Sequence, residues 1–196
     1  MANIDIKPSR TMPNLQHLLD PYVDKSSAII NSIIEINAGT LNKYELITET
    51  WHIKLDRVGY SSQVYPTAYG LIPQTWDQDS DLLDVMVVDV TEPLVPGVVA
   101  DLRVIGVMKF EDGGERDDKI IAVLNDDKRM DHITSYRDLG EHRQSLTEDY
   151  WIHYKDLKKP GTCKPLGFFW VEEALNIIDE CAQRYVSEYL PLLDQA

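Results

Sequence analysis

Short runs of apolar and β-branched residues, broken by turn residues, make up the first half of the chain. Residues 28–36 form one such run, and residues 42–47 and 49–57 alternate polar with apolar positions. A period of two is typical of strands with one solvated face, so we expect these three segments to form an antiparallel meander. Residues 60–73 follow with two prolines and a glycine among aromatic residues. That composition predicts a loop.

Three further apolar runs predict strands in the middle of the chain. They cover residues 85–90, 101–110 and 120–124, and the turn-like residues 92–97 and 111–118 separate them. Short strands joined by turns at this spacing are typical of β-barrels. We therefore expect a closed or nearly closed barrel.

The last third of the chain changes to a helical period. One apolar stripe predicts a helix that ends at residues 158–161, and it comprises Leu146, Tyr150, His153, Tyr154 and Leu157. A second stripe comprises Val171, Ala174, Leu175, Ile178, Cys181, Ala182 and Tyr185. Two helices after a series of strands indicate an α+β protein, with the helices packed on one side of the barrel.

The length of 196 residues is enough for one well-buried domain. We expect residues 28–196 to form that domain. Residues 1–27 contain three prolines and no sustained periodicity, which predicts an extended arm along the surface. The arm would be held down by apolar side chains, namely Leu15, Leu18 and Leu19.

The formal charge of −14 makes a nucleic-acid partner unexpected. The N-terminal residues contain no apolar run suited to a signal peptide, and no segment reaches membrane-spanning length, so we expect a cytoplasmic protein without a membrane partner. Two cysteines are present, Cys163 and Cys181. They could form one disulfide, but Cys181 also fits the apolar face of its helix as a small hydrophobic residue.

An acidic cluster precedes the apolar run at residue 85. Asp79, Asp81 and Asp84 fall within six residues. Carboxylates at this density repel one another unless a cation lies between them, and oxygen ligands favour a hard cation such as magnesium. An acidic, solvated turn explains the same pattern without a metal.

A second acidic group, Asp112 and Asp117, flanks two glycines that permit a tight turn, and Lys119 follows. An ordinary charged hairpin loop is the alternative. Lys43 and Glu45 lie two apart on a strand and should point to the same face.

Further basic and aromatic residues are candidates for an anion site. Arg57 and Lys155 could bind phosphate oxygens, although each alone reads as a surface residue. Tyr65 and Tyr69 read as half-buried aromatic residues that could also donate hydroxyl hydrogen bonds.

Carboxylates together with scattered bases suit the attack of metal-activated water on a phosphoryl group. The five histidines lack zinc-ligand spacing, no serine or cysteine lies in a nucleophile motif, and no glycine-rich phosphate loop is present. Two other functions stay open: a non-catalytic binding module with an OB-like fold, and a metal phosphohydrolase that acts on nucleotides. The binding module would not need Lys43, Arg57, Lys119 and Lys155 to converge on the acids.

The motifs resemble those of the first family of soluble inorganic pyrophosphatases. The segment from Asp79 to Val85 resembles the family signature, and the spacing of the remaining motifs agrees over about residues 28–175. Those motifs are Glu35, Lys43-Tyr44-Glu45, Asp56-Arg57, Tyr65-Pro66 with Tyr69-Gly70, Asp112 to Lys119, and His153 to Leu157.

The resemblance implies a five-stranded OB-like barrel with flanking C-terminal helices, and magnesium-dependent hydrolysis of pyrophosphate without a covalent intermediate. It implies that several Mg²⁺ ions are held by Asp79, Asp84, Asp112 and Asp117, and that Asp81 is the base. It assigns pyrophosphate and phosphate to Lys43, Arg57, Tyr69, Lys119, Tyr154 and Lys155. It places Glu35, Glu45 and Tyr65 in the outer shell, and it implies a homo-oligomer, usually a hexamer.

Three positions depart from the family pattern. The family commonly has glycine and proline where this chain has Ser80 and Leu82, and many members carry a second acid in place of Gly113. Loss of the proline is expected to loosen the turn before Asp84.

Overall fold

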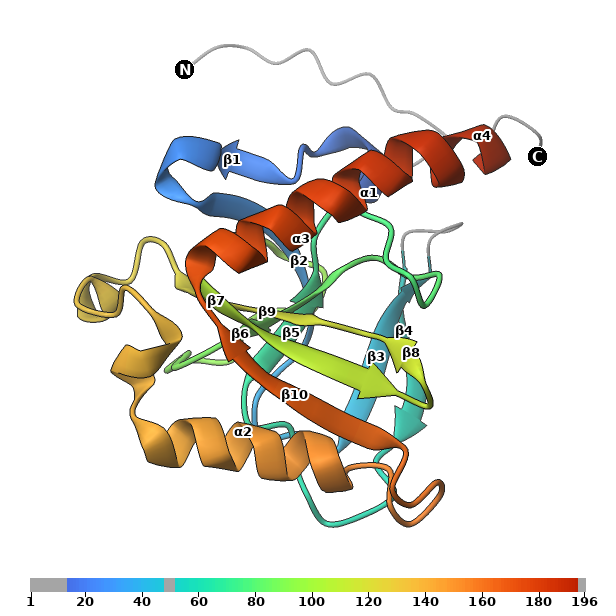
Figure 1. Ribbon diagram of the computed structural model, residues 1–196, viewed down its shortest axis with the longest axis vertical. Helices are drawn as coiled ribbons and strands as arrows, with labels where there is room; N and C mark the ends of the chain where they lie inside the picture. Colours follow the sequence, from blue (N-terminus) through green and yellow to red (C-terminus); the bar gives the residue numbers. More distant parts are fainter. Residues whose placement is uncertain (1–13, 48–51, 194–196) are drawn as a thin grey trace.

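The computed structural model describes residues 14–47 and 52–193. Five strands form a closed ring (Figure 1) in which each strand pairs with the next and the last pairs with the first. In ring order they are β2 (Ile29–Ile36), β5 (Ala68–Leu71), β6 (Asp84–Val87), β9 (Lys119–Leu124) and β7 (Val99–Asp112). The pair β6–β9 is parallel and the others are antiparallel. The predicted five-stranded barrel of an α+β fold is confirmed.

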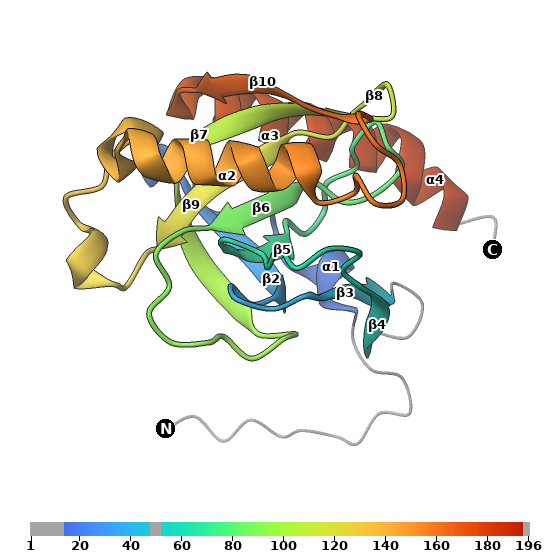
Figure 2. The same ribbon diagram turned by 90° about the horizontal axis from the view of Figure 1, so that it is seen from below.

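Further strands extend the ring or lie apart from it. β1 (Tyr22–Asp24) pairs with β2, while β8 (Glu115–Arg116) and β10 (Cys163–Phe169) pair with β7. The strands β3 (Asn42–Ile47) and β4 (His52–Val58) pair with each other in a separate sheet, at the edge of the molecule in Figure 2. The predicted three-strand meander is therefore only partly correct: β3 and β4 pair as antiparallel strands, but β2 pairs with β1, β5 and β7 instead. Residues 49–51 of the predicted third strand lie outside the described residues.

The helices lie outside the ring. The two long ones are α2 (Glu141–His153) and α3 (Val171–Arg184), and the π-helical turn η4 (Tyr185–Tyr189) and α4 (Leu190–Leu193) continue α3. Short elements elsewhere are α1 (Leu15–Leu18), η1 (Lys25–Ser27), η2 (Lys128–Met130) and η3 (Tyr136–Leu139). Among the described residues, none of these helices combines the length and the apolar character needed to cross a membrane.

Successive residues of the ring strands face two different cores, as the alternation of a pleated strand requires. Val85 and Val87 pack in one cluster with residues of α3, whereas Met86 packs in another with Trp151 of α2. Figure 1 shows α3 and α2 on either side of β10. The prediction that both helices pack on one side of the barrel is therefore wrong.

The stripe predicted for the first helix is also only partly correct. α2 ends at His153, and its buried residues are Thr147, Tyr150 and Trp151. Leu146 and Leu157 of the predicted stripe are 51% and 74% exposed. In contrast, α3 buries Ala174, Ile178 and Cys181 of its predicted stripe, and also Ile177, which the stripe did not include. Both cysteines are buried and free.

The predicted arm includes regular structure in its described part. Residues 14–27 contain α1, β1 and η1, and β1 joins the main sheet beside β2. Leu15 packs against the core, whereas Leu18 is 63% exposed. Residues 1–13 lie outside the described residues, and the division into an arm and one domain over residues 28–196 stays a prediction.

The predicted loop over residues 60–73 contains β5, a fully buried strand. Prolines at positions 66 and 73 bracket it, so it is too short to show a periodicity. Gly70 explains why it can pack so closely: a Cβ atom there would lie 2.3 Å from the carbonyl oxygen of Ile33 on the paired strand. Glycine is required by this close approach of two backbones.

Replacing Gly70 by alanine should therefore destabilise the protein by at least about 2 kcal/mol, because backbone atoms of β2 and β5 have to separate. The free energy of unfolding, measured in urea, checks this. Gly59→Ala is a suitable comparison, because its Cβ would approach Leu41 at 3.0 Å and should cost clearly less. Equal losses in the two variants would contradict the close approach at Gly70.

Candidate active site

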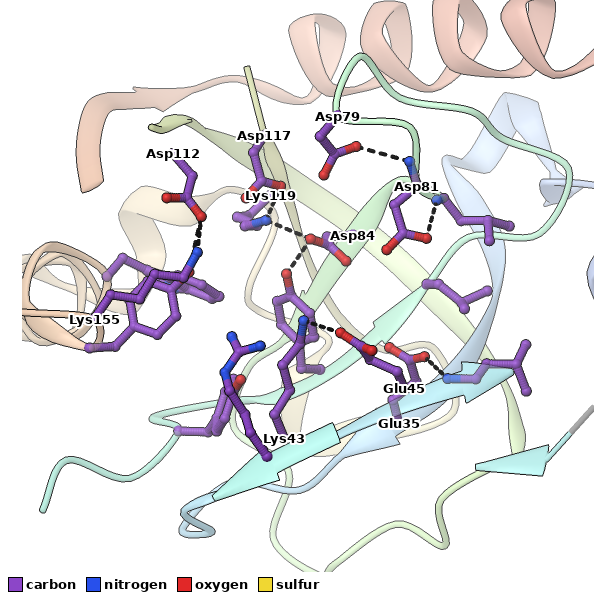
Figure 3. Close-up of a pocket in the computed structure, with 18 residues that line it drawn as sticks. Glu35, Lys43, Glu45, Asp79, Asp81, Asp84, Asp112, Asp117, Lys119 and Lys155 are labelled. Carbon is purple, nitrogen blue, oxygen red and sulfur yellow. Dashed lines mark hydrogen bonds and ion pairs between the residues drawn. The ribbon is translucent and has the colours of Figure 1, made fainter. Parts of the chain in front are cut away.

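One cleft contains every side chain that the sequence and the family resemblance indicated. Figure 3 shows how they face one another. They are Glu35, Lys43, Glu45, Arg57, Tyr65, Tyr69, Asp79, Asp81, Asp84, Asp112, Asp117, Lys119, Tyr154 and Lys155. They come from β2, β3, β4, the loop before β5 and β5 itself, the loop before β6 and β6 itself, the end of β7, the two residues between β8 and β9, β9, and the residues that follow α2.

The parallel pairing of β6 and β9 brings the two acidic groups together. Asp84 is the first residue of β6, and its pairing partner is Lys119, the first residue of β9. Asp117 lies two residues before Lys119 and therefore at the same edge of the sheet. Asp79 and Asp81 lie in the loop that leads into β6. The two acidic groups, which are 28 or more residues apart in the sequence, thus meet because β6 and β9 begin side by side.

Lys119 connects the two acidic groups. Its ammonium lies 2.5 Å from Asp84 Oδ2 and also pairs with Asp117. The side chain is almost fully buried, and its ammonium lies 5.2 to 5.8 Å from the ring centres of Trp151, Phe110 and Tyr69. Burial lowers the pKa of Lys119, but Asp117 and Asp84 outweigh it and the net shift is upward. Lys119 is therefore a permanent cation within the cleft.

The remaining acids are hard to ionise together. Loss of hydration, with the charges of Asp117 and Asp84, raises the pKa of Asp79 to about 7. Loss of hydration and the charge of Asp84 raise the pKa of Asp81 to about 6. Both pKa shifts come first from lost hydration and then from neighbouring carboxylates, so a cation bound there would be stabilising.

Two further lysines, Lys43 and Lys155, lie apart from Asp79 and Asp81 in Figure 3, each beside another carboxylate of the cleft. Lys43 pairs with Glu45 on the same face of β3, as predicted. Lys155 pairs with Asp112. Loss of hydration is the largest single effect on Asp112 and raises its pKa. The hydrogen bond and the charge of Lys155 act against it, and the net shift of the pKa is downward.

Two further contacts involve residues of the cleft. Arg57 contacts its neighbour Asp56 at 2.6 Å. The hydroxyl group of Tyr154 donates to Asp112 Oδ2 at 3.5 Å. Tyr154 and Lys155 follow α2 rather than lying inside it, which corrects the prediction that Lys155 is a helical residue.

The donor set fits a hard divalent cation, since it offers only oxygen ligands from several carboxylates. Within residues 14–47 and 52–193, no three acidic, histidine or cysteine side chains already surround one point as a finished ligand cage. The lysines explain this, because Lys119 and Lys155 hold oxygens of Asp84, Asp117 and Asp112. Binding of a cation by these acids requires the lysines to give up these contacts.

Apolar residues of the cleft were missed by the sequence reasoning. They are Leu46, Leu71, Leu82 and Trp151. The indole N–H of Trp151 donates to Met86 Sδ at 3.2 Å, and the ring packs against Tyr65, Tyr69 and Tyr154. The sequence did contain a pattern that indicates Trp151 as a cleft residue. Trp151 lies next to Tyr150 and three residues before Tyr154, at helical spacing near the end of α2.

The departures from the family pattern have visible consequences. Ser80 adopts φ +66°, a left-handed conformation that glycine adopts without strain. Gly113 also has a positive φ, +65°. The backbone N–H of Leu82 donates to Asp81 Oδ1 at 2.8 Å, a bond that proline could not make. The turn before Asp84 is therefore held by a hydrogen bond in place of the proline.

Glu35 provides a test, in the metal-free protein, of whether burial in the cleft raises the pKa of its acids. Burial raises its pKa from 4.5 to about 8, opposed by the N–H of Leu46, which donates to Oε1 at 2.6 Å. Between these two pH values the folded protein keeps a proton that the unfolded chain has lost. The contribution of Glu35 to stability is therefore full below about pH 4.5 and falls as pH rises towards 8.

Glu35→Gln should remove this fall, which is on the order of 3 kcal/mol, because glutamine stays neutral and can still accept from Leu46. Urea unfolding at pH 5 and pH 8 with a chelator measures it. Glu92→Gln, at an exposed acid, should keep the wild-type dependence. A Glu35→Gln variant with the same pH dependence as the wild type would show that Glu35 is ionised in the folded state.

Comparisons with known proteins identify the family of this chain. The family model described as inorganic pyrophosphatase matches residues 32–186. The inorganic pyrophosphatase of Neisseria meningitidis serogroup B is 42% identical over 177 residues, which cover 89% of this chain and 98% of that protein. The crystal structure of an inorganic pyrophosphatase from Neisseria gonorrhoeae has a TM-score of 0.83 at 41% identity, and the match covers 87% of this chain and 98% of that one.

A more distant relative gives the same result. The crystal structure of inorganic pyrophosphatase from Thermus thermophilus has a TM-score of 0.80 at 37% identity, covering 88% of this chain and 99% of that one. These matches extend along almost the full length of the relatives, and the predicted resemblance is confirmed. The chain belongs to the inorganic pyrophosphatase family, in its first, bacterial-type class.

Proposed function

We propose that the chain is an enzyme that hydrolyses inorganic pyrophosphate to two phosphates, with magnesium as the metal. One observation carries the proposal: acids and bases converge on one cleft instead of being dispersed over the surface. The cleft lining includes seven carboxylates and four basic side chains, which are Glu35, Glu45, Asp79, Asp81, Asp84, Asp112, Asp117, Lys43, Arg57, Lys119 and Lys155. This convergence argues against the alternative of a non-catalytic binding module, which has no use for the bases.

The residues would divide the work as follows. Magnesium held by Asp79, Asp84, Asp112 and Asp117 would neutralise substrate charge and make bound water more acidic. Asp81 would accept the proton of the attacking water, and its side chain is oriented for this by the N–H of Leu82. Water as the nucleophile removes the need for a covalent intermediate.

The basic and phenolic side chains would bind the substrate and the products. Lys43, Arg57 and Lys119 would carry positive charge towards the anion, and so would Lys155, which follows α2. The hydroxyl groups of Tyr69 and Tyr154 would donate to phosphate oxygens. Glu35, Glu45 and Tyr65 would orient these groups from the outer shell. Phosphoryl transfer depends mainly on positioning and charge neutralisation, which such a set provides.

A phosphate-release assay tests this function. Pyrophosphate, triphosphate and ATP should be supplied to the purified protein with magnesium and, separately, with EDTA. We expect rapid release from pyrophosphate that depends on the metal, and much slower release from the other two. Preferential release from ATP would favour a nucleotide phosphohydrolase, and a folded protein inactive on all three would refute the proposal.

We also propose, from the family resemblance, that the protein is a cytoplasmic homo-oligomer, most simply a hexamer. Large exposed apolar side chains could be covered in such an assembly, for example Leu157 at 74% exposed and Leu146 at 51%. Light scattering after size-exclusion chromatography measures the mass. A mass of one 22.4 kDa chain at micromolar concentration would refute the assembly.

A further inference from the structure

The last turns of α3 hold the loop that carries Asp79 and Asp81. The N–H of Trp76 donates to the carbonyl oxygen of Cys181 at 2.9 Å. Arg184 reaches back to the same loop with two nitrogens of its guanidinium group: Nε donates to Trp76 O at 2.9 Å and Nη2 to Asp77 Oδ1 at 2.9 Å. Three contacts therefore attach two neighbouring loop residues to one helix.

Asp77 closes this loop through backbone hydrogen bonds to its other end. Its N–H donates to the carbonyl oxygen of Asp81 at 2.7 Å, and its own carbonyl oxygen accepts from the N–H of Ser80 at 3.2 Å. Its carboxylate accepts from the N–H of Gln78 at 2.8 Å. The residue is only 5% exposed. The backbone of residues 77–81 is thus a closed unit, and the position of Asp77 determines where the two carboxylates of the loop point.

The same helix also contacts the second acidic loop. Asp118, next to Asp117, is 1% exposed and accepts from the N–H of Phe110 at 3.0 Å and from Arg116 Nε at 2.5 Å. Arg116 in turn lies 3.9 Å from Glu180 on α3. Glu180 and Arg184 are four residues apart and therefore lie on one face of the helix. α3 is a common support for both acidic loops.

We propose that Arg184 is a positioning residue for the metal site: by holding Asp77 against α3, it sets the separation of the loop that carries Asp79 and Asp81 from the loop that carries Asp117. The inference rests on the proposed function in taking these acids as ligands. Magnesium requires nearly ideal octahedral geometry, so a small displacement of a ligand loop lowers affinity. Residues behind metal ligands commonly contribute about ten- to a hundredfold to metal affinity.

Two of the acceptors of Arg184, Trp76 O and Asp77 Oδ1, explain why arginine is needed. The guanidinium fork reaches a backbone carbonyl and a carboxylate at once, whereas a lysine ammonium at the same place could serve only one of them well. Arg184→Gln would leave the buried carboxylate of Asp77 without its cation and free the loop from α3. Arg184→Lys would keep the charge and lose the fork, so we expect an intermediate effect on the metal site.

Arg103 offers a matched control. Its guanidinium group also supports a loop, through donation to Ile133 O at 2.6 Å and to Met130 O at 2.8 Å. That loop contributes none of the side chains that line the cleft. Arg184→Gln and Arg103→Gln should therefore both lower the melting temperature, but only the first should change the metal site.

The experiment measures binding of Mn²⁺ and Mg²⁺ by isothermal titration calorimetry to the full-length protein without pyrophosphate. We expect Arg184→Gln to weaken metal binding about tenfold, Arg184→Lys to weaken it less, and Arg103→Gln to leave it unchanged. The magnesium concentration that gives the half-maximal rate of hydrolysis should rise most in Arg184→Gln, less in Arg184→Lys and not at all in Arg103→Gln. The rate at saturating magnesium should stay within about twofold of the wild type in all three variants.

Other results would overturn the inference. Wild-type metal affinity in a folded Arg184→Gln protein would mean that Arg184 has only a structural role. An equal loss of metal affinity in Arg184→Gln and in the Arg103→Gln control would mean the same. If Arg184→Gln does not fold, unchanged metal affinity in Arg184→Lys would have the same meaning. Because metal binding is measured without pyrophosphate, a wild type that binds metal but fails to hydrolyse pyrophosphate refutes the proposed function and not this inference.

Discussion

Asp81→Asn should lower the rate of pyrophosphate hydrolysis by about 10²- to 10⁴-fold, the range expected for removal of a general base. Asparagine has nearly the same shape as aspartate and keeps the oxygen that accepts from the N–H of Leu82 at 2.8 Å. It cannot take up a proton from water. The fold should survive, because Asp81 lines the cleft and is not one of the buried core residues.

The measurement is steady-state phosphate release at saturating magnesium, with circular dichroism and the melting temperature as checks on folding. Asp126→Asn is a matched control, because it removes one negative charge from an exposed acid outside the cleft. We expect wild-type turnover in that control. Wild-type turnover in Asp81→Asn would remove Asp81 from the mechanism and leave another group to act as base.

The barrel and the members of the site could be predicted because both follow from local patterns. Each ring strand except β5 is an apolar or β-branched run in the sequence, and the spacing of the acidic and basic motifs carries the family resemblance. The site then assembles through strand pairing. Once β6 and β9 lie parallel, with Asp84 opposite Lys119, the two acidic groups have to meet.

β5 and β10 are two of the strands that local patterns did not predict, because tertiary contacts decide them. β5 contains Gly70, a poor strand residue by itself, and becomes a strand because that glycine allows contact with Ile33. β10 contains Pro165 and Gly167, and its register with β7 shifts between them. Proline is tolerated there because β10 is the edge strand of the sheet.

The contacts of the charged groups could not be predicted either. Sequence reasoning assigned Lys119 to the substrate, and that assignment stays a proposal. The structure shows that the same lysine also pairs with Asp84 and Asp117. The support of both acidic loops by α3 depends on residues such as Arg184 and Asp77, about 107 positions apart. No spacing rule connects such positions, since only the folded chain brings them together.

The pairing of Lys119 leads to the second large prediction, for Lys119→Met. In the metal-free protein this change removes the cation between two carboxylates of which Asp117 is largely buried, at 14% side-chain exposure. Removing one partner of a buried ion pair costs about 3–5 kcal/mol, because the remaining charges lose their compensation. Methionine fills most of the space, so loss of packing should add little.

Magnesium should reverse much of this loss. A divalent cation held by Asp84 and Asp117 would supply the charge that Lys119 supplies in the metal-free protein, and in the variant it would no longer compete with the ammonium group. Ligand binding to the folded state raises stability according to its affinity. We therefore expect saturating magnesium to raise the melting temperature of Lys119→Met by more than it raises that of the wild type.

Urea and thermal unfolding, each with EDTA and with magnesium, measure both effects. Lys109→Met is the control, since Lys109 pairs with Glu173 at a partly exposed position outside the cleft and should cost at most about 1 kcal/mol. Its response to magnesium should equal that of the wild type. If Lys119→Met also responds like the wild type, metal and lysine do not share these carboxylates. Asp84 and Asp117 would then have to be removed from the proposed ligand set. A cation bound by these carboxylates would compete with the Lys119 ammonium for the same oxygens, so loss of the lysine would have to change its effect on stability.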